Sequence, residues 1–238
     1  MRTPAILVTG ASKGIGLSAA RLLAAGGWRV IGAARSAPDA FQGEFHEVDL
    51  GDADATARLG AALAARGDVL GVVNNMGAAR AEKVGEVDPR VFAQIMELNL
   101  RPALQLTQAL LPAMRAARFG RIVNVTSLVT LGLPFRTSYA AAKSALQSFT
   151  RTLAAELAGE GVTANAVAPG PTETELFRAN NPPGGEGEAR YLAQVPMRRL
   201  GAPDEIGAAI AFLASGAAGF ITGQTLHVDG GASLGRAP

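Results

Sequence analysis

Short apolar runs alternate with longer segments of helical periodicity along the whole chain of 238 residues. The apolar runs are Ala5–Val8, Arg29–Ala33, Glu44–Val48, Gly71–Val73, Arg121–Val125, Thr163–Val167 and Thr225–Val228. The helical segments are Gly14–Ala25, Ala53–Arg66, Pro89–Arg118, Ser138–Gly159 and Pro203–Leu213. Several runs are nearly continuous in Val, Ile and Leu, which is typical of strands buried on both faces of a parallel sheet. The alternation predicts an α/β fold, with one doubly wound (Rossmann) parallel sheet of about seven strands and helices on both faces.

No linker and no internal repeat interrupts this pattern, so we expect residues 1–238 to form a single domain. Two connections depart from it. Residues 35–43 are too few for a helical crossover and contain Pro38, which predicts a loop or a single turn. Residues 170–202 lack clear periodicity, and a connection this long predicts a lid over a substrate, mobile in its Pro/Gly-rich centre.

Composition excludes several classes of function. The chain has no cysteine and only two histidines, His46 and His227, far apart in sequence, so we expect no metal site. With 22 basic and 20 acidic residues the net charge is only +2, and no basic patch predicts nucleic-acid binding. No signal peptide and no membrane-spanning run is evident, which favours a cytoplasmic location.

A glycine-rich turn follows the first apolar run directly, as Thr9-Gly10-Ala11-Ser12-Lys13-Gly14-Ile15-Gly16, and a helical segment comes next. Gly10 permits a tight turn, Gly14 lets the backbone approach a phosphate, and Gly16 allows close packing of the helix. The helix N-terminus offers free N–H groups to a pyrophosphate. Strand, glycine turn and helix in this order predict a dinucleotide site.

The end of the second predicted strand indicates which dinucleotide is preferred. NAD sites usually place a carboxylate there for the ribose 2′-hydroxyl. This chain has no acid in Ile31–Ser36 but has Arg35, and Lys13 adds a second cation. Two cations without a carboxylate suit a 2′-phosphate, so we predict NADP(H).

Tyr139 and Lys143 are four residues apart at the start of the helical segment Ser138–Gly159. Residues at this spacing lie on one face of a helix, one turn apart. An ammonium beside a phenol lowers the phenol pKa, so we expect Tyr139 to exchange protons near neutral pH. Such a pair is common on helix surfaces and indicates little on its own. It indicates a catalytic role here because the chain also contains the glycine turn.

With these motifs together, the chain resembles the short-chain dehydrogenase/reductase family over essentially its whole length, and within it the 3-oxoacyl-acyl-carrier-protein reductase group. The resemblance rests on the glycine turn, the Tyr139–Lys143 pair and several further positions. These are Asp49, Asn74-Asn75-Met76-Gly77, Asn99, Ser127, Pro169-Gly170 and the tail Gly223–Gly231.

The resemblance implies a role for each matching residue. It implies a catalytic set made of Asn99, Ser127, Tyr139 and Lys143. Asp49 and Leu50 would flank the adenine, while Asn74 and Gly77 would lie along the cofactor. Pro169, Gly170 and either Thr172 or Thr174 would border the nicotinamide amide, and Ser12 and Ile15 belong to the phosphate turn. Asn74 has an alternative reading as a residue that satisfies backbone groups at a strand end, and Asn99 one as a helix-bending residue.

Two positions depart from the family pattern. Met76 stands where the family usually has Ala, and either narrows the cofactor groove or fills a gap elsewhere. Ser127 precedes Tyr139 by twelve residues, one fewer than the family spacing, which Thr126 would match. We take Ser127 as the catalytic hydroxyl and place a one-residue deletion in the loop between Leu128 and Phe135.

The predicted function is hydride transfer between NADP(H) and a carbonyl or secondary alcohol, with Tyr139 as acid or base and a 3-oxoacyl thioester as the first candidate substrate. Alternatives are a ketone, steroid or sugar reductase of the same family, or a non-catalytic NADP(H)-binding regulator. Candidate substrate-pocket residues are Leu133, Phe135, Phe177 and Tyr191. Arg101, Arg115 and Arg118 are candidates for docking an acidic carrier protein, and a homotetramer or homodimer is expected from the resemblance.

Overall fold

The computed structural model describes residues 3–179 and 181–235. Its centre is one sheet of seven parallel strands in the order β3-β2-β1-β4-β5-β6-β7. The strands are β1 (Ala5–Thr9), β2 (Arg29–Ala34), β3 (Glu44–Glu47), β4 (Val69–Asn74), β5 (Gly120–Val125), β6 (Val162–Pro169) and β7 (Thr225–Val228). The predicted doubly wound parallel sheet is confirmed.

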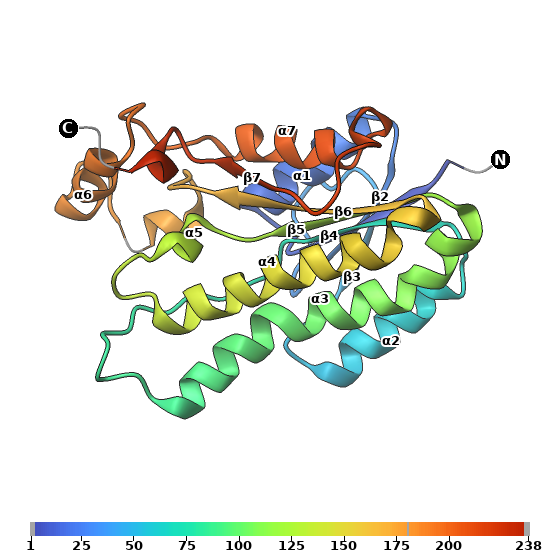
Figure 1. The fold of residues 1–238 in the computed structure, drawn as a ribbon, viewed down its shortest axis with the longest axis horizontal. Helices are drawn as coiled ribbons and strands as arrows, with labels where there is room; N and C mark the ends of the chain where they lie inside the picture. The colour runs from blue at the N-terminus through green and yellow to red at the C-terminus, as the bar shows by residue number, and fades with distance from the viewer. Residues whose placement is uncertain (1–2, 180, 236–238) are drawn as a thin grey trace.

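Helices cover both faces of the sheet (Figure 1). On one face, α1 (Gly14–Ala25) packs against α7 (Pro203–Leu213). On the other face, α3 (Pro89–Ala117) lies between α2 (Ala53–Ala64) and α4 (Thr137–Leu157). All five predicted helical segments are therefore present.

Two hydrophobic cores lie on opposite sides of the strands. Leu7 of β1 belongs to the core with Leu106 of α3, whereas Ile6 and Val8 belong to the core with Ile206 of α7. Successive side chains of a strand point to opposite faces, so a strand that feeds two cores must be apolar throughout. This explains why the runs show no polar alternation.

The strand order reverses at β1, which has β2 on one side and β4 on the other. In open α/β sheets a crevice forms at such a point, outside the carboxyl ends of the strands. The segments that leave β1 and β4 are the glycine turn and residues 75–77. The fold therefore brings these two sequence motifs together.

The connection from β2 to β3 carries no helix among its residues 35–43, as the sequence predicts. Phe41 and Phe45 pack there edge to face, with ring centroids 5.0 Å apart. A Cβ on Gly32 would lie 2.6 Å from both rings, so the glycine in β2 makes room for them. Two aromatic side chains thus cover the sheet where a crossover helix would otherwise lie.

The segment 170–202 is more regular than its sequence suggests. It contains the short helices α5 (Glu175–Arg178) and α6 (Glu186–Gln194) beyond the carboxyl ends of the strands (Figure 1). Arg178 forms an ion pair with Glu188 at 2.7 Å, which ties α5 to α6. Such contacts stabilise helices too short to be seen as a periodic pattern. The predicted mobility of the Pro/Gly stretch is not tested, and residue 180 lies outside the described residues.

Candidate active site

Tyr139 lies in the first turn of α4 and Lys143 one turn further on, next to the end of β5. The Lys143 side chain is only 2% exposed. Its Nζ donates to the carbonyl oxygen of Val125 at 2.9 Å and lies 5.7 Å from the centroid of the Tyr139 ring. The helical spacing therefore brings the two side chains together, but the ammonium is over the ring and bonded to β5.

Burial dominates the protonation of both groups. It raises the pKa of Tyr139 to about 12, against the opposing effects of a hydrogen bond from Ser127 and the charge of Arg136. Burial also lowers the pKa of Lys143 to about 8. Burial thus raises the pKa of Tyr139 where the sequence led us to expect a lower one, and Lys143 is not among the groups that oppose this rise.

Ser127, rather than Thr126, meets Tyr139. The Ser127 hydroxyl hydrogen-bonds to the phenol and also accepts from the N–H of Val129 at 3.3 Å, at the start of the 3₁₀ turn Leu128–Leu131. Thr126 is 2% exposed, and its hydroxyl donates to the carbonyl of Val167 in β6. The shorter loop thus leaves Ser127 beside the tyrosine.

Asn99 is buried in the middle of α3 and directs its amide to two backbone carbonyls. Its Nδ2 donates to Ile95 and to Ala78, each at 2.8 Å. Its Oδ1 has no partner among the described residues. A Cβ on Gly77 would lie 2.7 Å from this oxygen and 3.0 Å from Lys143 Nζ. Asn99 and Lys143 therefore face the same point beside Gly77, and a side chain there would displace them.

The glycine turn joins β1 to α1 in a conformation that other residues rarely adopt. Gly10 has φ +65° and Gly14 has φ +54°. A Cβ on Gly16 would lie 2.1 Å from the carbonyl oxygen of Gly10, so the helix passes directly against the turn. Helix α1 begins at Gly14 after Lys13, which makes no side-chain cap, so the first N–H groups are free for an anion. Ser12 and Ile15 are both partly buried in this turn.

Asn75 holds the glycine turn, a role that the sequence analysis missed. Its Nδ2 donates to the carbonyl oxygens of Thr9 and Gly10 at 3.0 and 3.2 Å. The side chain of Asn74 is instead 3% exposed and donates to Asn124 and Thr107 in the core. Strand alternation could have revealed the buried position of Asn74. Asn74 is two residues after Val72, so both side chains lie on the face of β4 that packs under α3.

Comparison with known proteins agrees with this geometry. A family model described as enoyl-(acyl carrier protein) reductase matches residues 10–233. The 3-oxoacyl-[acyl-carrier-protein] reductase FabG of Vibrio cholerae is 43% identical over 235 residues, which cover 94% of this chain and 95% of that protein. The Escherichia coli FabG is 41% identical over the same shares. A solved structure described as a short chain dehydrogenase/reductase family protein has a TM-score of 0.87 and 40% identity, covering 97% of both chains. The chain belongs to the short-chain dehydrogenase/reductase family.

In this short-chain dehydrogenase/reductase, the two cations predicted to bind a 2′-phosphate are both available. Arg35 follows the last residue of β2, and Lys13 precedes α1. Both side chains are exposed, and neither forms an ion pair or a hydrogen bond with another side chain in the described part of the chain. A charge with no partner of its own costs little to redirect toward a phosphate.

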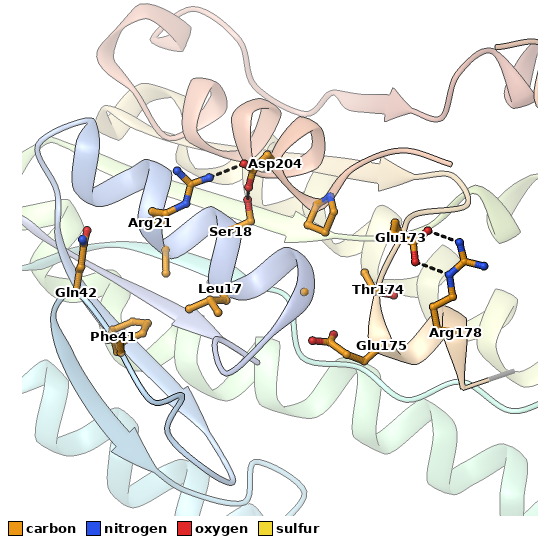
Figure 2. A pocket seen from close by; sticks show the side chains of 14 residues that line it. Leu17, Ser18, Arg21, Phe41, Gln42, Glu173, Thr174, Glu175, Arg178 and Asp204 are labelled. Carbon is orange, nitrogen blue, oxygen red and sulfur yellow. Dashed lines mark hydrogen bonds and ion pairs between the residues drawn. The ribbon is translucent and has the colours of Figure 1, made fainter. Parts of the chain in front are cut away.

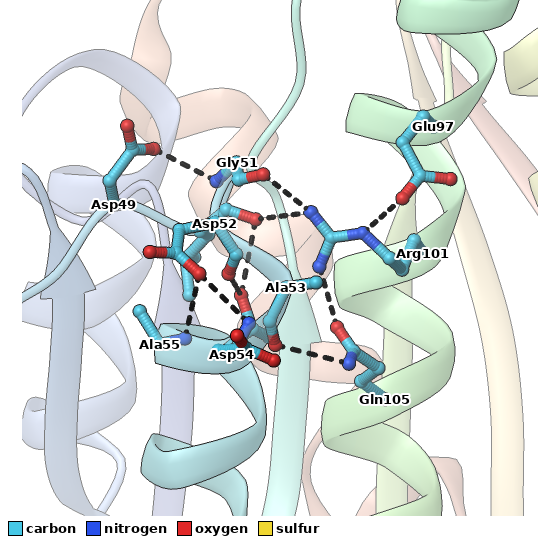
Figure 3. Close-up of polar contacts among 11 residues, drawn as sticks. Asp49, Gly51, Asp52, Ala53, Asp54, Ala55, Glu97, Arg101 and Gln105 are labelled. Atoms are coloured by element: carbon cyan, nitrogen blue, oxygen red, sulfur yellow. Dashed lines mark hydrogen bonds and ion pairs between the residues drawn. The ribbon is translucent and has the colours of Figure 1, made fainter.

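The loop after β3 is held from the side by helix α3 (Figure 3). Arg101 donates to the carbonyl oxygens of Gly51 at 2.7 Å and Leu50 at 3.3 Å. Gln105 donates to Ala53 at 3.2 Å, and the exposed Asp49 accepts from the N–H of Gly51. The predicted adenine-side loop is therefore fixed by side chains that the sequence analysis did not connect to it.

The suggestion that Arg101 docks an acidic carrier is wrong for this structure. Its side chain is 14% exposed and is engaged by Glu97, Gln105 and the loop carbonyls. Of the other two candidates, Arg115 pairs with Glu160 and Arg118 donates to the carbonyl of Gly159. All three are occupied in contacts within the chain.

The turn after β6 directs the segment 170–202 over the glycine turn. Gly170 donates to Val228 of β7, and the Thr172 hydroxyl bonds back to Gly170. The methyl group of Thr174 lies 3.3 Å from the position of a Cβ on Gly14. The structure thus places Thr174, rather than Thr172, against the glycine turn, while Pro169 ends the strand.

A cavity of about 630 Å³ opens beside this contact (Figure 2). Its walls come from α1, the β2–β3 connection, α5 and the start of α7, and include Leu17, Phe41, Glu175 and Asp204. None of Asn99, Ser127, Tyr139 and Lys143 lines it. The cavity is therefore a neighbour of the glycine turn and not the catalytic pocket.

Two of the four predicted substrate-pocket residues meet. The rings of Phe177 in α5 and Tyr191 in α6 are edge to face at 5.3 Å. The Tyr191 hydroxyl accepts from Arg136, the residue before α4, at 3.2 Å. Phe135 is 55% exposed, and Leu133 is partly buried. The segment 170–202 thus reaches the start of the catalytic helix through Tyr191.

The start of α4 depends on a distant carboxylate that the sequence analysis did not identify. Glu82 is 9% exposed, and its side chain accepts from the N–H of Ser138 at 3.3 Å. Its own N–H donates to the carbonyl of Phe135 at 3.0 Å, where the backbone has a φ of +61°. These contacts fix the strained turn from which Tyr139 emerges.

Met76 packs against the core beneath α3, so it fills a gap there.

Over residues 3–179 and 181–235, no group of three or more His, Cys, Asp or Glu side chains is arranged to hold a metal ion. No helix within those same residues has the length and hydrophobicity to cross a membrane.

Proposed function

We propose that this chain is an NADP(H)-dependent reductase of 3-oxoacyl thioesters or closely related carbonyl compounds. The observation that carries the proposal is the meeting of Ser127, Tyr139 and Lys143 beside Asn99 and Gly77. The FabG reductases of Vibrio cholerae and Escherichia coli, named for 3-oxoacyl-[acyl-carrier-protein], support the substrate class.

The residues present fit an NADP cofactor. A side chain on Gly10, Gly16 or Gly77 would collide with neighbouring protein atoms, so these three positions accept only glycine, and Gly77 lies beside Lys143. Arg35 and Lys13 are suited to the 2′-phosphate, and the N-terminus of α1 to the pyrophosphate. A solved candidate 2-deoxy-D-gluconate 3-dehydrogenase of Agrobacterium tumefaciens, 32% identical with a TM-score of 0.89, contains bound NADP. The match covers 98% of this chain and 97% of the other.

In the proposed reaction, the reduced nicotinamide supplies the hydride to the carbonyl carbon. Tyr139, which its pKa of about 12 keeps protonated, gives its proton to the developing alkoxide. Ser127 donates a hydrogen bond to the same oxygen and fixes its position. Lys143 Nζ lies 5.7 Å from the centroid of the Tyr139 ring and is the nearest charged proton donor in its own helix. The free Oδ1 of Asn99 is an acceptor, and its proposed role is to hold a water that connects Lys143 to solvent.

We also propose that the enzyme is cytoplasmic and works as a dimer or tetramer. Large apolar side chains are exposed on α7, on β7 and between them, namely Phe212 at 45%, Phe220 at 104% and Leu226 at 41%. Exposed apolar side chains of this kind mark contact surfaces.

The segment 170–202 is proposed to act as a lid, because it touches both the glycine turn and the start of α4.

The test is an NADPH oxidation assay with a panel of carbonyl compounds that includes acetoacetyl thioesters. We expect turnover with at least the thioesters, a preference for NADPH over NADH, and loss of turnover in Tyr139→Phe with NADPH binding retained. Turnover that survives in Tyr139→Phe would remove Tyr139 from the mechanism. No oxidation with any member of the panel would overturn the proposed function.

A further inference from the structure

Arg136 lies between the catalytic helix and the segment 170–202. It is the residue immediately before α4, three positions ahead of Tyr139. Its Nη2 donates to the hydroxyl of Tyr191 in α6, and its side chain is partly buried. The guanidinium therefore lies between the start of the catalytic helix and α6.

The charge of Arg136 has no counterion within residues 3–179 and 181–235. No carboxylate there lies within ion-pair distance of its guanidinium. Glu82 is a candidate counterion, because its backbone forms a β-bridge with Arg136. Its carboxylate, however, accepts from the N–H of Ser138. Glu188 of α6 pairs with Arg178 instead. A guanidinium has five donors, and only two are used here, by Tyr191 and the carbonyl of Phe135.

A guanidinium with unused donors and no ion pair of its own can bind an anionic ligand without breaking an existing contact. The Phe177–Tyr191 pair beside it gives an apolar wall, so a ligand here has a carbon skeleton as well as a charge. Arg136 and Tyr139 are three positions apart at the start of α4, a spacing that places two side chains on the same face of a helix, so one small molecule can contact both.

We propose that Arg136 binds an anionic group of the substrate, and that the chain accepts carbonyl compounds with a carboxylate close to the carbonyl carbon, such as 3-oxo acids. Arg136 is then a specificity-determining residue, since a planar guanidinium matches a carboxylate in a bidentate manner. The inference rests on the proposed function, because it takes Tyr139 as the acid of a carbonyl reduction. It departs from the neutral thioester that the relatives' names suggest.

The test compares two substrates that differ only in charge, acetoacetate and methyl acetoacetate, in the wild type and in Arg136→Gln. We expect the wild type to prefer acetoacetate in kcat/KM. In Arg136→Gln, kcat/KM for acetoacetate falls by about a hundredfold, because a charge-assisted contact is lost. The value for the ester changes by less than about threefold, since the ester never used the charge. Arg190→Gln, which removes an exposed arginine of α6, serves as the matched control.

Each outcome bears on the inference. An equal fall for both substrates in Arg136→Gln would overturn it, because Arg136 would then act on Tyr139 and not on the substrate. If kcat/KM in Arg136→Gln falls for acetoacetyl-coenzyme A but not for acetoacetate, the inference is also overturned, because Arg136 would then bind a phosphate of the coenzyme A arm. Turnover of neutral thioesters without any preference for the anion would overturn the inference and leave the proposed function intact. No NADPH oxidation with any carbonyl compound would overturn both.

Discussion

Replacing Lys143 by methionine tests the electrostatics of the site without using catalysis as the readout. Methionine keeps the length of the side chain and removes the charge. Lys143 is 2% exposed, and burial lowers its pKa from 10.5 to about 8. The folded chain therefore carries an ammonium at pH 7 that it has difficulty solvating, whereas the unfolded chain does not.

The sign and size follow from proton linkage. Between pH 8 and 10.5 the unfolded chain binds a proton at Lys143 that the folded chain does not, so the stability of the wild type rises with pH. Compared with a side chain that does not titrate, the charge of Lys143 lowers the free energy of unfolding of the wild type by about 3 kcal/mol at pH 7. The reduction is about 2 kcal/mol at pH 9 and less than about 1 kcal/mol at pH 10. The variant also loses the bond to Val125, a cost of about 1–2 kcal/mol that does not depend on pH.

The measurement is urea unfolding of the cofactor-free protein at pH 7, 9 and 10. The free energy of unfolding of Lys143→Met minus that of the wild type should fall by about 2–3 kcal/mol between pH 7 and 10. All other titrating groups are common to both proteins and cancel. Lys83→Met, which removes a lysine whose side chain is 66% exposed, should show a difference that is flat with pH. A flat difference for Lys143→Met as well would refute a depressed pKa at this lysine.

Three further predictions concern the cofactor and the direction of reaction. Arg35→Asp should lower the NADPH/NADH ratio of kcat/KM by about a hundredfold, and an unchanged ratio would remove Arg35 from cofactor choice. Arg101→Leu frees the carbonyl of Gly51 and should raise the Kd of NADPH about tenfold, measured by fluorescence. It should leave the Kd of reduced nicotinamide mononucleotide unchanged, because that molecule lacks the adenosine half, and equal weakening of both would contradict the loop-positioning role. Because the pKa of Tyr139 is about 12, kcat/KM for alcohol oxidation should rise about tenfold per pH unit above neutrality while kcat/KM for reduction stays flat. A flat oxidation profile would count against Tyr139 as the base.

The sheet and its helices were predictable because strands buried on both faces leave a strong apolar signal. Ile6, Leu7 and Val8 feed two cores in turn, and no helix or surface strand requires that pattern. The helices α5 and α6 were not predictable in the same way. They are short, and their stability comes from contacts such as Arg178 with Glu188, which a linear pattern does not display.

The candidate site divides along similar lines. The spacing of Tyr139 and Lys143 guarantees that they share a helix face, but it says nothing about where the ammonium points. That direction is set by the carbonyl of Val125, which is eighteen residues away and belongs to another element. The roles of Asn75, Glu82 and Arg101 were missed for the same reason, since each acts on a segment that the fold brings to it.

The opposite pKa shifts of Tyr139 and Lys143 have one cause and one consequence. Each group is pushed toward its neutral form because the space between β5 and α4 solvates charge poorly. A neutral phenol is an acid, so the resting site is prepared to protonate an alkoxide and not to remove a proton from an alcohol. Taking that proton at pH 7 from a group with a pKa of about 12 costs about 7 kcal/mol, which the reduction direction does not pay. The burial that makes Lys143 a liability for stability therefore also keeps Tyr139 in the protonated form that carbonyl reduction uses.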